Sequence, residues 1–130
     1  MGAVVIRDHE ILLVKRKNPP SKGQWAIPGG RIQLGETLQK AAERETVEET
    51  GIIIQATDPI YTFDMIVQDH DDTVTYHYVI VDLAADYIGG ALTHGDDASD
   101  AAWFTAHELK PLNVNTTTLK LLTQIGFLPI

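Results

Sequence analysis

The sequence contains no cysteine. A chain without thiols forms no disulfide framework, no thiolate zinc site and no cysteine nucleophile. It also has no apolar run near the roughly 18–20 residues that a membrane-spanning helix needs. Its start lacks the basic segment and long apolar stretch of a secretory signal. From these absences we expect a cytoplasmic protein with no membrane partner.

Positive charge is scarce, because 10 Lys and Arg residues face 18 Asp and Glu residues, which gives a formal net charge of −8. Non-specific nucleic-acid binding needs a basic face, so we expect no nucleic-acid partner. An acidic protein also repels an anionic ligand unless arginine, lysine or a bound metal ion intervenes. With 130 residues and 44% hydrophobic content, the chain suits one compact domain over residues 1–130.

Short apolar, β-branched runs bounded by turn residues predict the strands. They fall at residues 3–6, 11–15, 25–27, 52–56, 60–67, 73–83 and 101–105. The first two strands, joined by residues 8–10, are predicted to form a hairpin, and a longer hairpin is predicted around residues 68–72. Residues 18–23 are rich in turn formers and are predicted to be a loop.

Helices are predicted at residues 37–50 and 114–125, the second with apolar Leu119, Leu122 and Ile125. Strands that flank one central and one terminal helix indicate the α/β class. We therefore expect an α/β/α sandwich with a mixed β-sheet between helices.

The first predicted helix has clear ends. Thr37 can serve as its N-cap, and Gly51 stands where a C′ glycine belongs. At about 100° per residue, Leu38, Ala41 and Ala42 define an apolar stripe along it. The stripe identifies the face that should pack against the core.

Toward the end of this helix the stripe runs into Glu45 and Glu49, with Glu48 on its flank. Like charges at these spacings destabilise a helix by about 0.2–0.5 kcal/mol per pair, and they oppose the helix dipole. One interpretation is a solvated acidic face paired with Lys40 or Arg44. The other is a cage for hard cations such as Mg²⁺ or Mn²⁺, which prefer carboxylate oxygen and would cancel the repulsion.

A spaced motif surrounds the helix. The sequence reads Gly30, five residues, Glu36, seven residues, and then Arg-Glu-Thr-Val-Glu-Glu-Thr-Gly-Ile over residues 44–52. This pattern resembles the Nudix box, the signature of the Nudix hydrolases. One position departs from it: Thr46 stands where a large aliphatic residue is usual, and we expect Thr46 to be half-buried. No Gly-Lys-Ser/Thr follows the glycines, so a P-loop is excluded.

The resemblance covers roughly the whole chain. Residues 13–16 and 25–31 resemble the strand and loop that lead into the box, and residues 103–104 and 107–109 resemble the family's late strand and short helix. It implies a Nudix-type α/β/α sandwich. It also implies an enzyme that uses Mg²⁺ or Mn²⁺ to cleave a diphosphate linkage in a nucleotide-like small molecule.

The resemblance also implies roles for the acidic helix. Glu45, Glu48 and Glu49 would ligate the metal ions. The catalytic set is Glu45, Glu48 and Arg44, with Glu45 expected to be the general base toward water, although an acid outside the box takes that role in some relatives. Arg44 and Glu36 are expected to pair and to hold the preceding loop on the helix, so that Glu36 supports the structure.

Glycine and arginine supply the remaining candidates near the box. Gly29 and Gly30 allow a close approach of the backbone, Gly29 as a metal ligand and Gly30 in substrate binding. Arg16 and Arg31 are candidate phosphate clamps, because a guanidinium offers a bidentate fork. The alternative for each arginine is an ordinary surface cation.

Three other sets of residues have open roles. Asp97, with Asp96 beside it, is the candidate for an extra metal-linked acid that relatives often supply in this region, and the alternative is a solvated turn. Trp25 and Phe63 could stack on a base, although core packing is the simpler interpretation. The five histidines show no ligand spacing and are interpreted as ordinary polar residues.

Three functions follow. The first is hydrolysis of a nucleoside diphosphate sugar, above all of ADP-ribose to AMP and ribose 5-phosphate, because residues 16–23 resemble a loop of small ADP-ribose pyrophosphatases. A proline that those enzymes often carry is absent at residues 66–67. The second is a pyrophosphohydrolase of (d)NTPs that releases pyrophosphate; the tyrosine typical of dinucleoside polyphosphate hydrolases is missing from residues 67–69.

The third function is a non-catalytic sensor of nucleotide ligands on the same scaffold. Such sensors tend to lose box carboxylates, and all of them stand in this sequence. A homodimer is also expected, because relatives are often dimers.

Overall fold

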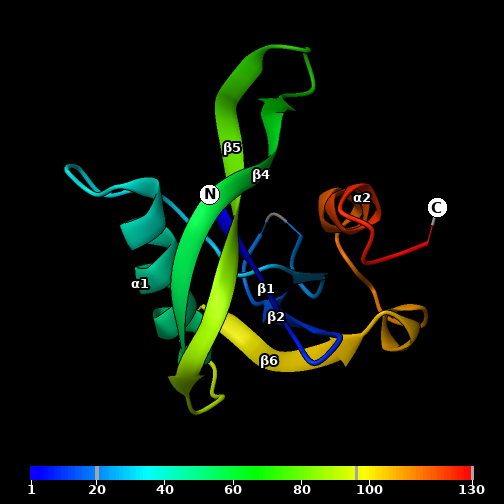
Figure 1. Ribbon diagram of the computed structural model, residues 1–130. Helices are drawn as coiled ribbons and strands as arrows, with labels where there is room; N and C mark the ends of the chain where they lie inside the picture. The colour runs from blue at the N-terminus through cyan, green and yellow to red at the C-terminus, as the bar shows by residue number, and fades with distance from the viewer. Residues whose placement is uncertain (20, 96, 130) are drawn as a thin grey trace.

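A single mixed sheet forms the centre of the molecule (Figure 1). Across residues 1–19, 21–95 and 97–129, which the computed structural model describes, six strands lie in the order β3-β2-β1-β5-β4, with β6 beside β2. The strands are β1 (Gly2–Arg7), β2 (Glu10–Arg16), β3 (Trp25–Ala26), β4 (Ile52–Gln68), β5 (Val74–Gly90) and β6 (Ala98–Thr105). β1 and β5 run parallel and the other pairs antiparallel, so the sheet is mixed as predicted.

The predicted first hairpin is confirmed. β1 pairs with β2 through Ile6–Ile11 and Arg7–Glu10. Asp8 and His9 between them both have positive φ, 51° and 67°. Two residues of positive φ match the twist of the flanking strands in a tight hairpin turn, and Asp tolerates this conformation better than most residues.

The second hairpin is confirmed but is longer than predicted. The predicted strands 52–56 and 60–67 join into one strand, β4, and β5 continues to Gly90 instead of ending at Leu83. The register shifts on both sides of Pro59. A bulge lets a residue without an N–H stay in a ladder, so the proline does not end the strand. Figure 1 shows the far part of this hairpin projecting beyond the rest of the molecule.

Alternating residues of β1 and β2 build a core on each face of the sheet. Ala3, Val5 and Leu12 pack with Ala42 of α1 (Leu38–Thr50). On the other face lies a second cluster, which contains Val4, Ile11, Leu13, Leu121 and Leu122, the last two from α2 (Thr116–Gln124). The two helices therefore cover opposite faces (Figure 1), and the predicted α/β/α sandwich is confirmed.

The C-terminal helix is confirmed but begins later than predicted. A short 3₁₀ helix, η1 (His107–Leu109), precedes it, and α2 begins after Asn115, whose side chain accepts hydrogen bonds from the N–H groups of Thr117 and Thr118. Of the three apolar residues named in the prediction, Leu122 is buried and Ile125 packs against the second cluster, whereas Leu119 is 37% exposed. The buried residues of the helix are Thr118, Leu121 and Leu122, which follow the helical spacing, and Leu119 lies outside this face.

No helix in the described ranges is both long enough and apolar enough to cross a membrane.

Thr46, the residue that departs from the Nudix box pattern, lies in the core. Thr46 is fully buried, which corrects the half-buried expectation, and its Oγ1 has no hydrogen-bond partner. An unsatisfied buried hydroxyl destabilises a fold, whereas valine has nearly the same shape without the polar atom. We therefore expect Thr46→Val to raise the free energy of unfolding by about 1 kcal/mol, measured by urea denaturation.

Thr50 provides the matched control for this substitution. Its hydroxyl donates to the Thr46 carbonyl at 2.6 Å and accepts from the Ile52 N–H at 3.1 Å. Thr50→Val on the same buried face is expected to destabilise the protein by about 1–3 kcal/mol, because it leaves the buried Ile52 N–H without its hydrogen-bond acceptor. Equal and unfavourable effects of both substitutions would contradict this interpretation of Thr46.

Asp82 is an acidic residue buried on β5. Burial raises the pKa of its carboxyl to about 6 from an ordinary 3.8, while the terminal ammonium of Met1 and the Gly2 N–H oppose that rise. The folded protein therefore holds this proton more tightly than the unfolded chain. The contribution of Asp82 to the free energy of unfolding is therefore at its full value below the unfolded pKa of 3.8. It is lost as the pH rises through the folded pKa of about 6.

Asp82→Asn should remove this pH dependence. At neutral pH the variant is expected to be more stable than the wild type by up to about 3 kcal/mol, and the difference should vanish near pH 4. Urea unfolding at both pH values measures it. Asp86→Asn, an exposed position on the same strand, serves as the control. If the free energy of unfolding depends on pH in the same way for wild type and Asp82→Asn, the buried Asp82 carboxylate is not the cause of the pH dependence.

Candidate functional site

The acidic helix is held at both ends as predicted. At its start the Thr37 hydroxyl accepts a hydrogen bond from the Lys40 N–H at 3.1 Å. At its end Gly51 takes the left-handed conformation, with φ 74°, and its N–H bonds to the Val47 carbonyl. The helix thus ends directly after the acidic patch.

Arg44 ties the preceding loop to the helix. Its Nε and Nη2 donate to the two carboxylate oxygens of Glu36 at 2.7 and 2.9 Å, so the predicted pair is confirmed. Nη2 also donates to the Arg31 carbonyl at 3.0 Å, and the Gln33 N–H donates to Glu36 at 2.8 Å. The Arg44 guanidinium lowers the pKa of the Glu36 carboxyl to about 2.

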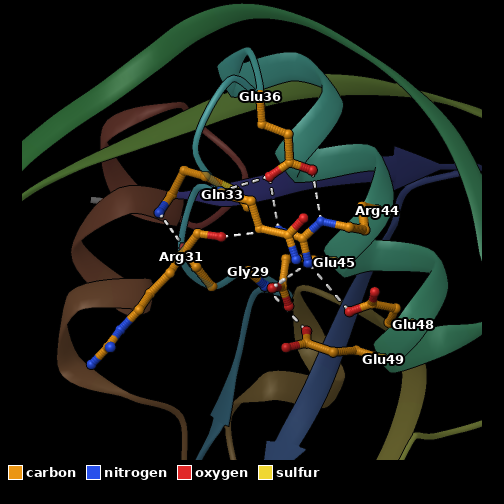
Figure 2. Close-up of polar contacts among 10 residues, drawn as sticks. Gly29, Arg31, Gln33, Glu36, Arg44, Glu45, Glu48 and Glu49 are labelled. Carbon is orange, nitrogen blue, oxygen red and sulfur yellow. Dashed lines mark hydrogen bonds and ion pairs between the residues drawn. The ribbon is translucent and has the colours of Figure 1, made fainter.

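The same guanidinium faces the acidic patch (Figure 2). Arg44 Nη1 donates to Glu45 at 2.9 Å and approaches Glu48 at 3.4 Å. Within the described ranges no three acidic or histidine side chains converge as a ready-made metal site. Glu45 and Glu48 would therefore turn from Arg44 toward a bound cation.

Glu49 behaves differently from its two neighbours. Its carboxylate is partly buried and accepts a hydrogen bond from the Gly29 N–H at 3.1 Å. Burial raises the pKa of Glu49 to about 8; Glu45 and Asp97 raise it further, and the Gly29 N–H and Arg16 oppose them. The alternative of a solvated acidic face paired with Arg44 fits the exposed Glu48, but it does not explain the partly buried Glu49. A divalent cation would offset both the desolvation and the repulsion.

The two glycines before the box have different surroundings. A Cβ on Gly30 would lie 2.6–2.8 Å from the carboxylate of Glu45, so the missing side chain makes room for that group. A Cβ on Gly29 would instead meet the Met1 carbonyl and lie 2.8 Å from Gly2 Cα. Gly29 therefore serves the pairing of this loop with the start of the chain, in which the Gly30 N–H donates to the Met1 carbonyl at 2.9 Å.

The remaining predicted site residues separate into two groups. Arg16 and Asp97 act on Glu49 through their charges: Arg16 lowers the pKa of the Glu49 carboxyl and Asp97 raises it. Arg31 does not point there: Figure 2 shows its side chain extending away from the carboxylates. Its Nη2 donates to the Tyr78 hydroxyl at 3.3 Å. The other candidate acid, Asp96, lies outside the described residues, as does Pro20 of the predicted loop.

The candidate base-stacking residues are placed by their packing. Trp25 is buried, with its ring edge-on to Phe104 at 4.9 Å between centroids, so it belongs to the core. Phe63 is half-buried beside Tyr61. Sequence reasoning missed Tyr76 and Tyr78, which are two residues apart on one strand and therefore share a face. That spacing was visible, but it is also typical of any half-buried strand.

A family model described as the NUDIX domain matches residues 1–125. The chain belongs to the Nudix family of hydrolases. The carboxylate patch, the Arg44–Glu36 pair and the two glycines before the helix are thus features of a Nudix box in its folded form.

Individual relatives fit this assignment. The ADP-ribose pyrophosphatase of Methanocaldococcus jannaschii is 38% identical over 112 residues, which cover 86% of this chain and 64% of that protein. The nucleoside triphosphatase NudI of Enterobacter sp. (strain 638) is 33% identical over 82% of this chain and 79% of that protein. A NUDIX hydrolase structure from Nitrosomonas europaea matches with a TM-score of 0.77 at 20% identity, over 96% of this chain and 68% of that one, which supports the fold.

Proposed function

We propose that this Nudix protein hydrolyses the diphosphate linkage of a nucleoside diphosphate derivative, with ADP-ribose as the favoured substrate and AMP and ribose 5-phosphate as products. The observation that carries the proposal is the partly buried Glu49 carboxylate, which accepts a hydrogen bond from the Gly29 N–H and whose pKa is raised by burial and by the charges of Glu45 and Asp97. The resemblance to the M. jannaschii ADP-ribose pyrophosphatase supports the choice of substrate.

The donor set fits a hard divalent cation. Glu45, Glu48 and Glu49 offer carboxylate oxygens on one helix, and the space left by Gly30 accommodates the carboxylate of Glu45. The carbonyl of Gly29 and the carboxylate of Asp97 are further candidate ligands. Bound Mg²⁺ or Mn²⁺ would neutralise the diphosphate and activate water for attack.

Side chains of this protein would then support hydrolysis of the diphosphate linkage. Water forms a bond to one phosphorus, the bond from that phosphorus to the bridging oxygen breaks, and the other phosphoryl group leaves with that oxygen. Glu45 is our candidate to accept the proton of water. Arg16 would attract the phosphates toward Glu49, and Arg44 would keep the loop and the helix in register through Glu36.

A second enzymatic function has its own support. The resemblance to the nucleoside triphosphatase NudI favours a pyrophosphohydrolase of (d)NTPs, which would use the same carboxylates on a different linkage. A nucleotide sensor fits less well, because such sensors tend to lose box carboxylates, and this chain retains all of them.

A substrate panel separates these functions. Purified protein is incubated with Mg²⁺, and separately with Mn²⁺, together with ADP-ribose, other nucleotide sugars, dinucleoside polyphosphates or (d)NTPs, and the products are resolved by chromatography. Preferential formation of AMP and ribose 5-phosphate is the expected result. Preferential release of pyrophosphate from one triphosphate would replace the proposed substrate. No turnover on the panel, with metal binding intact, would favour the sensor.

A homodimer and a cytoplasmic location stay predictions. The projecting hairpin exposes the apolar side chain of Ile66, which pairs with His77 and so lies on the face opposite to Tyr76 and Tyr78. A two-stranded ribbon gains stability when another surface covers it. Light scattering at micromolar concentration is expected to give the mass of two chains. The mass of one chain would contradict the dimer.

A further inference from the structure

Two tyrosines form an exposed aromatic surface on the projecting part of β5. Tyr76 and Tyr78 lie with ring centroids 6.1 Å apart and planes 13° from parallel. They are 56% and 37% exposed, so much of their surface faces solvent. Tyr61, on the paired strand, packs against the core instead. The exposed pair is therefore not explained by packing within the described chain.

Arg31 joins this aromatic surface to the acidic patch. Its carbonyl accepts from Arg44 Nη2 at 3.0 Å, and its own Nη2 donates to the Tyr78 hydroxyl at 3.3 Å. The carbon of its guanidinium lies 5.8 Å from the Tyr78 ring centroid. Gly30, directly before it, borders the carboxylate of Glu45. Arg31 thus links the two sites, because its backbone contacts Arg44 and its side chain contacts Tyr78.

We propose that Tyr76, Tyr78 and Arg31 bind the nucleobase of the substrate. This inference rests on the proposed function, which places the diphosphate at the carboxylates. A base has an aromatic face that stacks on tyrosine rings and on guanidinium planes. A nucleotide with its phosphates near Glu49 would place its base away from the acidic patch. The Arg31 side chain also extends away from the carboxylates and contacts Tyr78.

The chemistry of the three side chains predicts how selective this surface is. Stacking depends on the face of the base and is tolerant of its identity. Arg31 offers donors alone, and the Tyr78 hydroxyl, which accepts from Arg31, keeps a single O–H to donate. The surface therefore distinguishes nucleotides from base-free sugar phosphates more strongly than it distinguishes one purine from another.

AMP and ribose 5-phosphate test the surface independently of turnover, since neither contains a diphosphate linkage. Each is titrated into the protein with Mg²⁺ while the ring protons of Tyr76 and Tyr78 are followed by NMR. AMP is expected to shift these signals, and ribose 5-phosphate is not. Tyr78→Ala is expected to weaken AMP binding by about 5- to 150-fold, the equivalent of stacking one base, and to leave ribose 5-phosphate binding unchanged.

Two further variants separate stacking from other effects. Tyr78→Phe keeps the ring and removes the hydroxyl, so its affinity for AMP should stay closer to wild type than that of Tyr78→Ala. Val79→Ala changes the next residue, which is 64% exposed and points to the other side of the strand, and should bind AMP like wild type. If ADP-ribose is turned over, Tyr78→Ala should raise KM and leave kcat unchanged.

Several results would overturn the inference. One is AMP binding by Tyr78→Ala with wild-type affinity. Another is an equal response of the tyrosine signals to ribose 5-phosphate, and a third is a shift of those signals with protein dilution alone, which would assign the surface to a second copy of the chain. Failure of the proposed hydrolysis has a different signature: ADP-ribose is not cleaved, whatever AMP does at the tyrosines.

Discussion

Replacing Glu49 by glutamine is expected to reduce turnover by more than about 100-fold, because even groups that only support a metal ligand contribute 10–100-fold. The metal-free protein should remain at least as stable as wild type. Glutamine keeps an oxygen for the Gly29 N–H at this partly buried position and carries no charge to desolvate. Loss of activity with retained stability separates a functional carboxylate from a structural one.

Glu48→Gln is expected to reduce turnover to a similar extent. It should leave stability unchanged, because the exposed Glu48 carboxylate contacts only the Arg44 guanidinium within the described residues. Glu43→Gln is the matched control on the same helix, because Glu43 faces Lys40 and accepts from the Ala56 N–H. Turnover by product chromatography, Mn²⁺ binding by calorimetry and urea unfolding are measured together. Unchanged turnover in Glu48→Gln would refute the enzyme mechanism, and ligand binding without turnover in wild type would favour the sensor.

The parts of the site that sequence predicted are local. Thr37, Gly51 and the Glu36–Arg44 pair depend on spacings within one helix and its adjoining loop, and helix geometry converts such spacings directly into positions. The crowding of Glu45 and Glu49 on one helix followed from the same geometry. Whether each of these carboxylates binds a metal ion stays a prediction.

The parts that sequence missed depend on contacts between distant segments. Pro59 interrupts a strand pattern locally, but pairing with β5 continues on both sides of it, and the bulge absorbs the missing N–H. Thr46 is buried more deeply than expected, because the depth of a helix position depends on the distant segments that pack on it. The phosphate role of Arg31 stays a prediction, whereas its contact with Tyr78, on a distant strand, had no local signal in the sequence.

Replacing Gly30 by alanine is expected to reduce kcat, whereas replacing Gly29 by alanine is expected to reduce stability. In Gly30→Ala the new Cβ meets the carboxylate of Glu45, the end of a flexible side chain that can swing aside. The fold should persist while Glu45 is displaced. A misplacement of about 1 Å at a reacting centre can reduce the rate about 100-fold, and we expect a loss of that order in kcat with little change in stability.

In Gly29→Ala the new Cβ meets backbone instead, at the Met1 carbonyl and Gly2 Cα. Backbone there moves only by disrupting the pairing that includes the Gly30 N–H and the Met1 carbonyl. Overpacking of this kind costs about 1–3 kcal/mol, so a large loss of stability is expected. Gly89→Ala, with open space around its Cβ, is the control. Urea unfolding and kcat per folded molecule measure both effects. Equal loss of stability in Gly29→Ala and Gly30→Ala would mean that Glu45 cannot move aside, and that the acidic patch is a rigid part of the fold before any metal ion binds.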